Sequence, residues 1–186
     1  MQRGPLPGSS GRVRPLTAFG DPVLHRRSAE VAEFGAPLVR LIEDMFATMY
    51  AARGVGLAAC QIGVPLRVFV YDCPDDEERR HLGHLVNPRT VELSDASVRG
   101  PEGCLSLPGP EAAVARADRA VLSGSDSDGR LVGVTGEGFF ARCLQHECDH
   151  LDGVVYPDRL GAVRRRRLVR AARHTAWGRA GGAVPG

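Results

Sequence analysis

Three residues near the end of the chain, His146, Glu147 and His150, have the types and the spacing of a hydrolytic metal site. Because His146 and His150 are four residues apart, a helix would present both imidazoles on one face, where they can bind a single metal ion. Glu147 would lie on the same side, within reach of a water molecule at the metal. The pattern favours metal-assisted hydrolysis, and a solvated helix with two surface histidines is the alternative.

A catalytic metal site of this type needs a third protein ligand and a position left for water. No Glu follows Glu147, and Tyr156 stands where a metzincin-type pattern would have a third histidine. Cys143 is seven residues from His150, which is roughly 10 Å along a helix axis, too far for ligands of one metal. Cys148 falls on the other side of the helix. The remaining thiols are Cys60, Cys73 and Cys104.

Cys104 is the best placed of these thiols, because glycine and proline surround it in residues 101–108. Gly103 and Pro108 suggest a shaped loop rather than a core strand, and a thiolate on such a loop could complete the metal shell. The alternative is a small buried hydrophobic side chain, since free cysteine is often simply buried.

Residues 54–61 form a second segment of possible function, rich in glycine and ending in Gln61. Gly54 and Gly56 could let backbone N–H and C=O groups approach an extended substrate. Gln61 could then donate an amide hydrogen bond into the site. The two glycines could also do no more than close a helix and begin a strand.

Three helices are expected to position these segments. An apolar stripe at helical spacing predicts a helix over residues 37–53 whose stripe packs in the core. A second helix over residues 137–151, with Gly153 as its terminator, would carry the histidine pair. A third over residues 163–174 would carry the arginines Arg164, Arg165, Arg166, Arg167 and Arg170.

Short apolar runs separated by Gly, Pro, Asp and Ser predict strands at residues 67–71, 83–86, 90–93, 113–117, 120–123 and 131–134. Asp128 and Gly129 suggest a hairpin turn between two of them. The 186 residues suit one domain. We therefore expect a single α+β domain with antiparallel or mixed sheets around the metal-binding helix, and a C-terminal helix.

Composition narrows the possible partners. The net charge is only +2, so a DNA-binding role is not expected. No apolar run approaches the roughly 20 residues of a membrane span, and the first 14 residues lack the apolar centre of a signal peptide. Five cysteines make a disulfide framework improbable and favour metal or catalytic roles. We expect a cytoplasmic protein whose residues 1–12 form a disordered leader.

The segments at residues 54–61, 102–106 and 145–150 resemble the three signature motifs of the peptide deformylases, in the family's order. Residues 21–24 and 85–88 also look like the family, and the resemblance covers about residues 13–160. It implies a catalytic domain at 13–160 and a basic helix with a flexible tail at 161–186. Cys60 stands where the family most often has proline, a departure that removes no catalytic group.

The resemblance implies hydrolysis of the N-formyl group from the N-terminal formyl-methionine of nascent proteins, with release of formate. Cys104, His146 and His150 would be the metal ligands, and Glu147 the general base. The backbone N–H of Leu105 and the side chain of Gln61 would hold the developing oxyanion. The peptide would lie as an extra strand on the substrate-binding residues, which are Val55, Gly56, Gly103 and Cys143, the last beside the methionine side chain.

The resemblance further implies ferrous iron as the native ion, with Zn²⁺, Ni²⁺ or Co²⁺ able to replace it. The expected partners are formyl-methionyl peptides and nascent chains. The basic C-terminal arginines could also dock on ribosomal RNA, although a solvated helix face is the simpler interpretation. Two rival functions stay open. One is an HExxH metallopeptidase with another third ligand, and the other is a metal-binding family member without activity.

Overall fold

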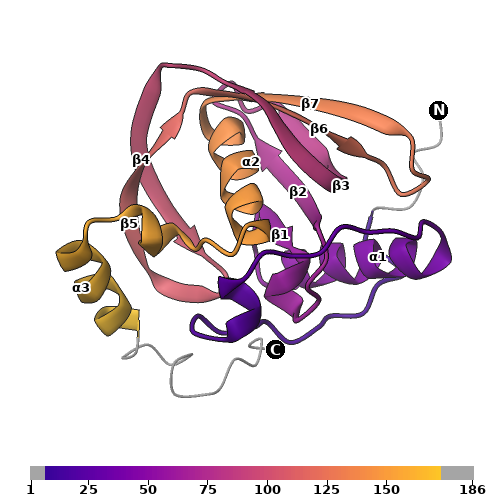
Figure 1. Ribbon diagram of the computed structural model, residues 1–186, viewed down its shortest axis with the longest axis horizontal. Helices are drawn as coiled ribbons and strands as arrows, with labels where there is room; N and C mark the ends of the chain where they lie inside the picture. Colours follow the sequence, from indigo (N-terminus) through magenta and orange to yellow (C-terminus); the bar gives the residue numbers. More distant parts are fainter. Residues whose placement is uncertain (1–6, 173–186) are drawn as a thin grey trace.

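The computed structural model describes residues 7–172, which form two antiparallel sheets around a central helix (Figure 1). The larger sheet has the order β1-β2-β3-β6-β7, and the smaller one pairs β4 with β5. The strands are β1 (Gly56–Ala58), β2 (Val68–Pro74), β3 (Arg80–Leu93), β4 (Ser97–Cys104), β5 (Leu107–Ala117), β6 (Arg119–Ser125) and β7 (Leu131–Glu137). The expected α+β domain is confirmed, and its named strand pairs are all antiparallel.

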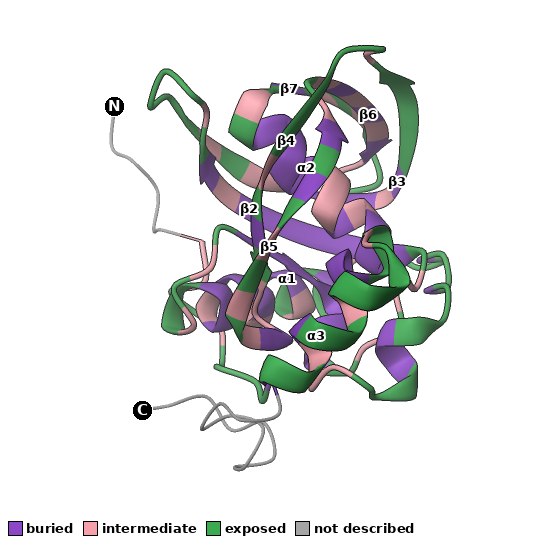
Figure 2. Cartoon of the chain, turned by 90° about the vertical axis from the view of Figure 1, so that its left-hand side faces the viewer, coloured by how far each residue is buried: buried purple, intermediate pink, exposed green. Residues whose placement is uncertain are grey.

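Helix α2 (Gly138–Leu151) lies between the two sheets and carries the histidine pair (Figure 1). Its Phe140, Leu144 and Leu151 are buried in a core cluster that also contains residues of β2, β5 and β6. A side chain from the β2–β3 turn caps its first turn, since Oδ1 of Asp76 accepts a hydrogen bond from the Phe139 N–H at 3.0 Å. Burial on both sides therefore fixes this helix in place (Figure 2).

Helix α1 (Ala36–Ala51) confirms the first predicted helix, with its end two residues earlier than expected. The helical spacing of Leu38, Ile42, Met45 and Met49 puts all four in a second core cluster, with Leu57 of β1 and residues of β2. The stripe is core packing, as expected. It supports β1, and β1 leads directly into the short 3₁₀ helix Ala59–Ile62 that holds Gln61.

Strand β3 replaces two of the predicted strands. The prediction was wrong in ending one strand at residue 86, because β3 continues past Asn87 and Pro88 through an irregularity in its pairing with β6. Asn87 has a positive φ of 51°, and its side-chain amide exchanges hydrogen bonds with the Val31 backbone at 2.8 and 2.9 Å. Turn-forming residues here produce a bulge in a long strand, not its end.

Strand β4 was not expected at all. Residues 97–104 pair with β5 along its length, so Cys104 lies at the end of a hairpin strand rather than on an isolated loop. Most of this strand is exposed, and it contains Gly100, Pro101 and Gly103. β5 itself begins six residues before the predicted start.

The two ends of the described chain pack on the domain. Residues 8–12 were expected in a disordered leader, but the backbone N–H groups of Gly8 and Arg12 donate to Glu43 and Asp44 of α1 at 3.0 and 2.8 Å. That expectation is wrong for this stretch. α3 (Ala162–Ala172) packs beside β5, and the rest of the expected leader and tail, at 1–6 and 173–186, lies outside the described residues. No helix within 7–172 is long and apolar enough to cross a membrane.

Candidate metal centre

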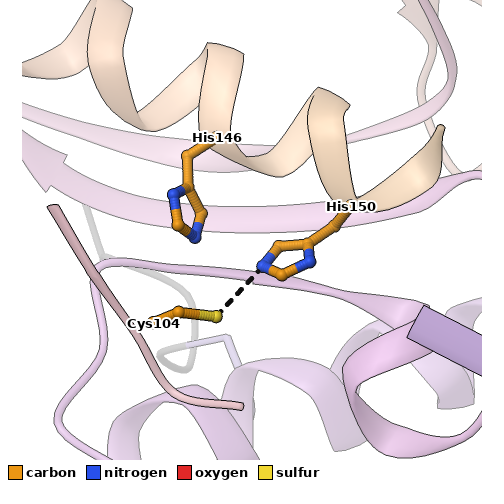
Figure 3. Close-up of side chains that lie close together, drawn as sticks. All are labelled: Cys104, His146 and His150. Carbon is orange, nitrogen blue, oxygen red and sulfur yellow. Dashed lines mark hydrogen bonds between the residues drawn. The ribbon is translucent and has the colours of Figure 1, made fainter. Parts of the chain in front are cut away.

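The two histidines of α2 point toward Cys104 at the end of β4 (Figure 3). One ligand atom from each of Cys104, His146 and His150 lies within 4.8 Å of the other two. Sγ of Cys104 is 3.2 Å from Nε2 of His150. A thiolate with two imidazoles is a donor set that suits zinc or iron-group ions. Glu147 follows His146 on α2 and lines the same cleft. Its Oε2 is buried without a hydrogen-bond partner among the described residues. These residues therefore fit a metal ion with a neighbouring base.

His146 is held by Glu102, whose Oε2 lies 3.1 Å from its Nδ1. This leaves Nε2 as the ring atom that faces Cys104, the usual arrangement in carboxylate–histidine–metal sites. Burial would lower the pKa of His146, but hydrogen bonds with Cys104 and Glu102 raise it well above its ordinary value. For His150, burial and the neighbouring His146 lower the pKa, which favours the neutral ligand form.

Glu102 is the centre of a buried ionic network. Nε and Nη2 of Arg116 donate to its two oxygens at 2.8 and 2.9 Å, and Nη1 of Arg142 donates at 2.8 Å. Burial would raise the pKa of Glu102, but the hydrogen bonds from Arg116 and His146 lower it to about 2. The carboxylate is therefore charged, and it orients the imidazole of a ligand.

The network continues onto α2 itself. Nη1 of Arg116 donates to Asp149 at 2.6 Å, and Arg159 also donates to Asp149 through its Nε, at 3.0 Å. Arg116 lies on β5, so one guanidinium joins β4, β5 and the histidine helix. Its side chain is only 4% exposed, which makes these pairs much less screened than surface ion pairs.

Glu147 lies beside Gly56 of β1. A Cβ on Gly56 would be 2.4 Å from its Oε1 and 3.0 Å from Sγ of Cys143, so only glycine fits there. Burial raises the pKa of Glu147 to about 7, although His146 opposes the change. A carboxylate with such a pKa can accept and return a proton near neutral pH.

Gln61 is fixed with its amide nitrogen toward the ligand thiol. Its Oε1 accepts a hydrogen bond from the Ala58 N–H at 2.8 Å, so Nε2 is the atom 3.4 Å from Sγ of Cys104 and 3.3 Å from Oγ of Ser106. The 3₁₀ turn after β1 provides this placement, because it folds Gln61 back onto its own N-terminus.

A cleft of about 510 Å³ brings the expected site residues together. Every residue proposed from sequence lines it except His150, which lies deeper behind Cys104 and is 1% exposed. Val55, Gly103 and Cys143 all line it, and Sγ of Cys143 lies 3.8 Å from the Val55 carbonyl oxygen. The cleft also includes Arg53, Pro110, Glu111 and Phe139.

Sequence reasoning missed the residues that hold the ligands in place. Glu102 was part of a recognised motif, and its position two residues before Cys104 was the only local signal of its role. Arg116 had none, because its partners Glu102 and Asp149 are 14 and 33 residues away, and Asp149 was part of the recognised segment 145–150 without a role of its own. Tyr156 was considered only as a poor ligand, but it packs against His146 with ring centroids 6.3 Å apart.

Comparisons with known proteins agree with this geometry. The family model described as "Polypeptide deformylase" matches residues 13–166. "Peptide deformylase 2" of Streptomyces avermitilis is 63% identical over 179 residues, which are 96% of each chain. A peptide deformylase structure from Ehrlichia chaffeensis in complex with actinonin has a TM-score of 0.83 and 34% identity, over 87% of this chain and 96% of that one.

A Met-Ala-Ser bound peptide deformylase structure from Acinetobacter baumannii has a TM-score of 0.74 and 33% identity, over 80% of this chain and 98% of that one. The match therefore spans the three motifs and both sheets, not only the histidine helix. This chain belongs to the polypeptide deformylase family, the metal-dependent hydrolases that remove the N-formyl group from the N-terminal methionine of nascent proteins.

Proposed function

We propose that this chain deformylates formyl-methionyl peptides with Cys104, His146 and His150 as metal ligands and Glu147 as general base. The observation that carries the proposal is the buried, unpartnered Oε2 of Glu147 beside three converging ligand atoms. We propose ferrous iron as the native ion, with Zn²⁺, Ni²⁺ or Co²⁺ as substitutes. When bound, a divalent ion supplies Lewis acidity, which lowers the pKa of water and polarises the formyl oxygen.

In this mechanism Glu147 takes the proton from the attacking water and later delivers a proton to the leaving amine. The C–N bond of the formamide breaks, and the products are formate and a peptide with a free amino group. Nε2 of Gln61 and the backbone N–H of Leu105 donate hydrogen bonds to the oxygen as it becomes negative. Losing one such donor typically lowers kcat by about 100- to 1,000-fold.

The peptide would bind as an additional strand on the backbone of Val55 and Gly103, which border the cleft. Backbone recognition suits an enzyme that acts on many sequences with one shared first residue. The first side chain would enter the cleft beside Gly56 and Cys143. The Met-Ala-Ser bound and actinonin-bound structures of the two solved relatives support a substrate of this class.

Formate release from formyl-Met-Ala-Ser, under anaerobic conditions with ferrous iron, tests the assignment. We expect turnover by the wild type and none by Glu147→Ala, with metal content unchanged. A peptidase would cleave unformylated peptides internally and keep its metal in Cys104→Ala. A binding protein would hold metal without turnover. Either result would overturn the proposed function.

We also propose cytoplasmic action on nascent chains, with the outer face of α3 as a ribosome contact. Arg166 and Arg170 are exposed and lie four residues apart, on the side of α3 opposite the buried Leu168. Deleting residues 163–186 would remove Leu168 from the core, so Arg166→Ala/Arg170→Ala is the better test. We expect this variant to co-sediment less with ribosomes at low salt, and unchanged co-sedimentation would exclude the contact.

A further inference from the structure

A second cavity, of about 460 Å³, lies between β5 and α3. Both ribbon views place α3 beside β5, and the β5 residues that line the cavity lie in the half of the strand nearer Cys104 (Figures 1 and 2). Its walls are apolar in the middle and basic at one side. The lining residues are Pro110, Glu111, Ala112, Ala113, Leu160, Arg164, Arg167, Leu168 and Ala171. Neither the metal site nor the proposed mechanism uses this cavity.

The cavity adjoins the catalytic cleft, because Pro110 and Glu111 line both. This shared segment of β5 is held firmly. The Tyr156 hydroxyl donates to the Pro110 carbonyl oxygen at 2.7 Å, and the same ring packs against His146. A chain that leaves the cleft along Pro110 and Glu111 therefore reaches the α3 cavity directly.

Two arginine side chains give the α3 side of the cavity a positive charge. Arg164 and Arg167 are exposed and three residues apart, so they lie on one flank of α3. The ion pairs found within residues 7–172 include none for either of them, whereas neighbouring Arg165 is paired with Asp158 at 2.8 Å. Glu111, at the boundary with the cleft, is also exposed. The path is thus negative near the cleft and positive beyond it.

We propose that this cavity is an exosite for the part of the nascent chain that follows the formyl-methionine, and that it favours acidic residues there. The inference rests on the proposed function. A peptide extending from the cleft is the occupant that the shared lining residues Pro110 and Glu111 favour. It must carry negative charge away from the methionine, because Arg164 and Arg167 offer unpaired positive charge and Glu111 disfavours acidic residues nearer the metal. The apolar floor of Leu160, Leu168 and Ala171 suits the peptide backbone and small side chains.

The test uses the metal-loaded full chain and a set of synthetic peptides. All begin with formyl-Met-Ala-Ser and continue to twelve residues with glycine and serine. A Glu-Glu or Lys-Lys pair is moved stepwise along the extension, and formyl-Met-Ala-Ser alone is the reference. We expect kcat/KM to be about fivefold higher for a distant Glu-Glu pair than for Lys-Lys at low salt, the scale of two partly exposed ion pairs. The preference should shrink in high salt, through KM rather than kcat.

Two charge-reversal variants give a matched comparison. Arg164→Glu/Arg167→Glu should reverse the preference toward Lys-Lys, with the tripeptide rate unchanged. Arg166→Glu/Arg170→Glu makes the same change in net charge at residues of α3 that do not line the cavity, and should keep the preference for Glu-Glu. A simple long-range field would affect both variants equally, so the contrast isolates the cavity.

Three outcomes would overturn the exosite. Equal rates for all extended peptides would do so if the tripeptide is hydrolysed normally. A preference that survives Arg164→Glu/Arg167→Glu would place the acidic residues elsewhere. Loss of ribosome binding in that variant, without any peptide preference in the wild type, would assign the cavity to RNA phosphates. Failure to hydrolyse the tripeptide is a separate result, because it would refute the deformylase mechanism on which the exosite depends.

Discussion

At Gly56 the absence of a side chain leaves room for both the base and the thiol at the floor of the cleft. We expect Gly56→Ala to lower kcat by at least tenfold, because the new methyl group would overlap Oε1 of Glu147 and crowd Sγ of Cys143. Both side chains are buried. The measurement is formate release, together with metal content and thermal stability.

Gly133→Ala is the matched control, since a Cβ there would approach nothing closer than the Leu122 carbonyl oxygen at 3.8 Å. Its activity should equal that of the wild type. If Gly56→Ala keeps full activity, Glu147 does not act from the position in which it lies beside this glycine.

At this scale the sequence predicted side chains that the structure brings together. Residue type and spacing alone singled out His146, Glu147 and His150, because residues four apart on a helix lie on the same face. Cys104 was only one of several possible thiols until the family motifs were considered. The contact between Glu102 and Arg116 could not be predicted from residue spacing, because it depends on the pairing of β4 with β5.

Among the elements, β4 and α2 are joined through Glu102, which contacts Arg142 and His146, and through the bonds of Arg142 to the Val98 and Gly100 carbonyl oxygens. We expect Glu102→Gln to destabilise the metal-free protein by about 3 kcal/mol, near the lower end for breaking a buried pair, because Arg116 keeps Asp149. Metal affinity should fall by about 10- to 100-fold, since His146 loses its charged orienting partner. Denaturant unfolding and metal titration measure the two effects.

The control is Glu92→Gln on β3, where the carboxylate is 59% exposed and pairs with Arg119 at 2.6 Å. A surface pair contributes at most about 1 kcal/mol, and metal affinity should not change. Equal effects in the two variants would mean that Glu102 contributes no more than a surface carboxylate and does not position the ligand.

Some of the helices and strands could be predicted from the sequence, and others could not. α1 followed from its apolar periodicity, because it buries one continuous face, whereas α2 followed from the histidine spacing and the terminator Gly153. β4 has no such pattern: it belongs to a two-stranded sheet with much exposed surface, and Gly100, Pro101 and Gly103 are typical of turns. β3 was divided in sequence at Asn87, where the side-chain contact with Val31 allows the chain to continue as a strand.

For the whole molecule, the proposed metal ligands Cys104, His146 and His150 would connect the smaller sheet to the central helix. Removing the ion with a chelator should therefore lower the melting temperature. For a site at a thousand times its Kd, the loss is about 4 kcal/mol, or on the order of 10 °C for a chain of this size. Calorimetry before and after reloading with ferrous iron measures the change.

Cys148→Ala, which changes a thiol of α2 outside the ligand set, should keep this response, and Cys104→Ala should lose it. If the chelator does not change the melting temperature of the wild type, the ion does not stabilise the contact between the smaller sheet and α2.

The charges buried around Arg116 also affect how the molecule responds to heat. The free energy needed to take ions out of water falls as temperature rises, whereas the stabilisation from apolar burial levels off. The contacts of Arg116 with Glu102 and Asp149 should therefore weaken less on warming than the apolar face of α1. On heating, the packing of α1 would loosen first. β4 and α2 would keep their relative positions longest.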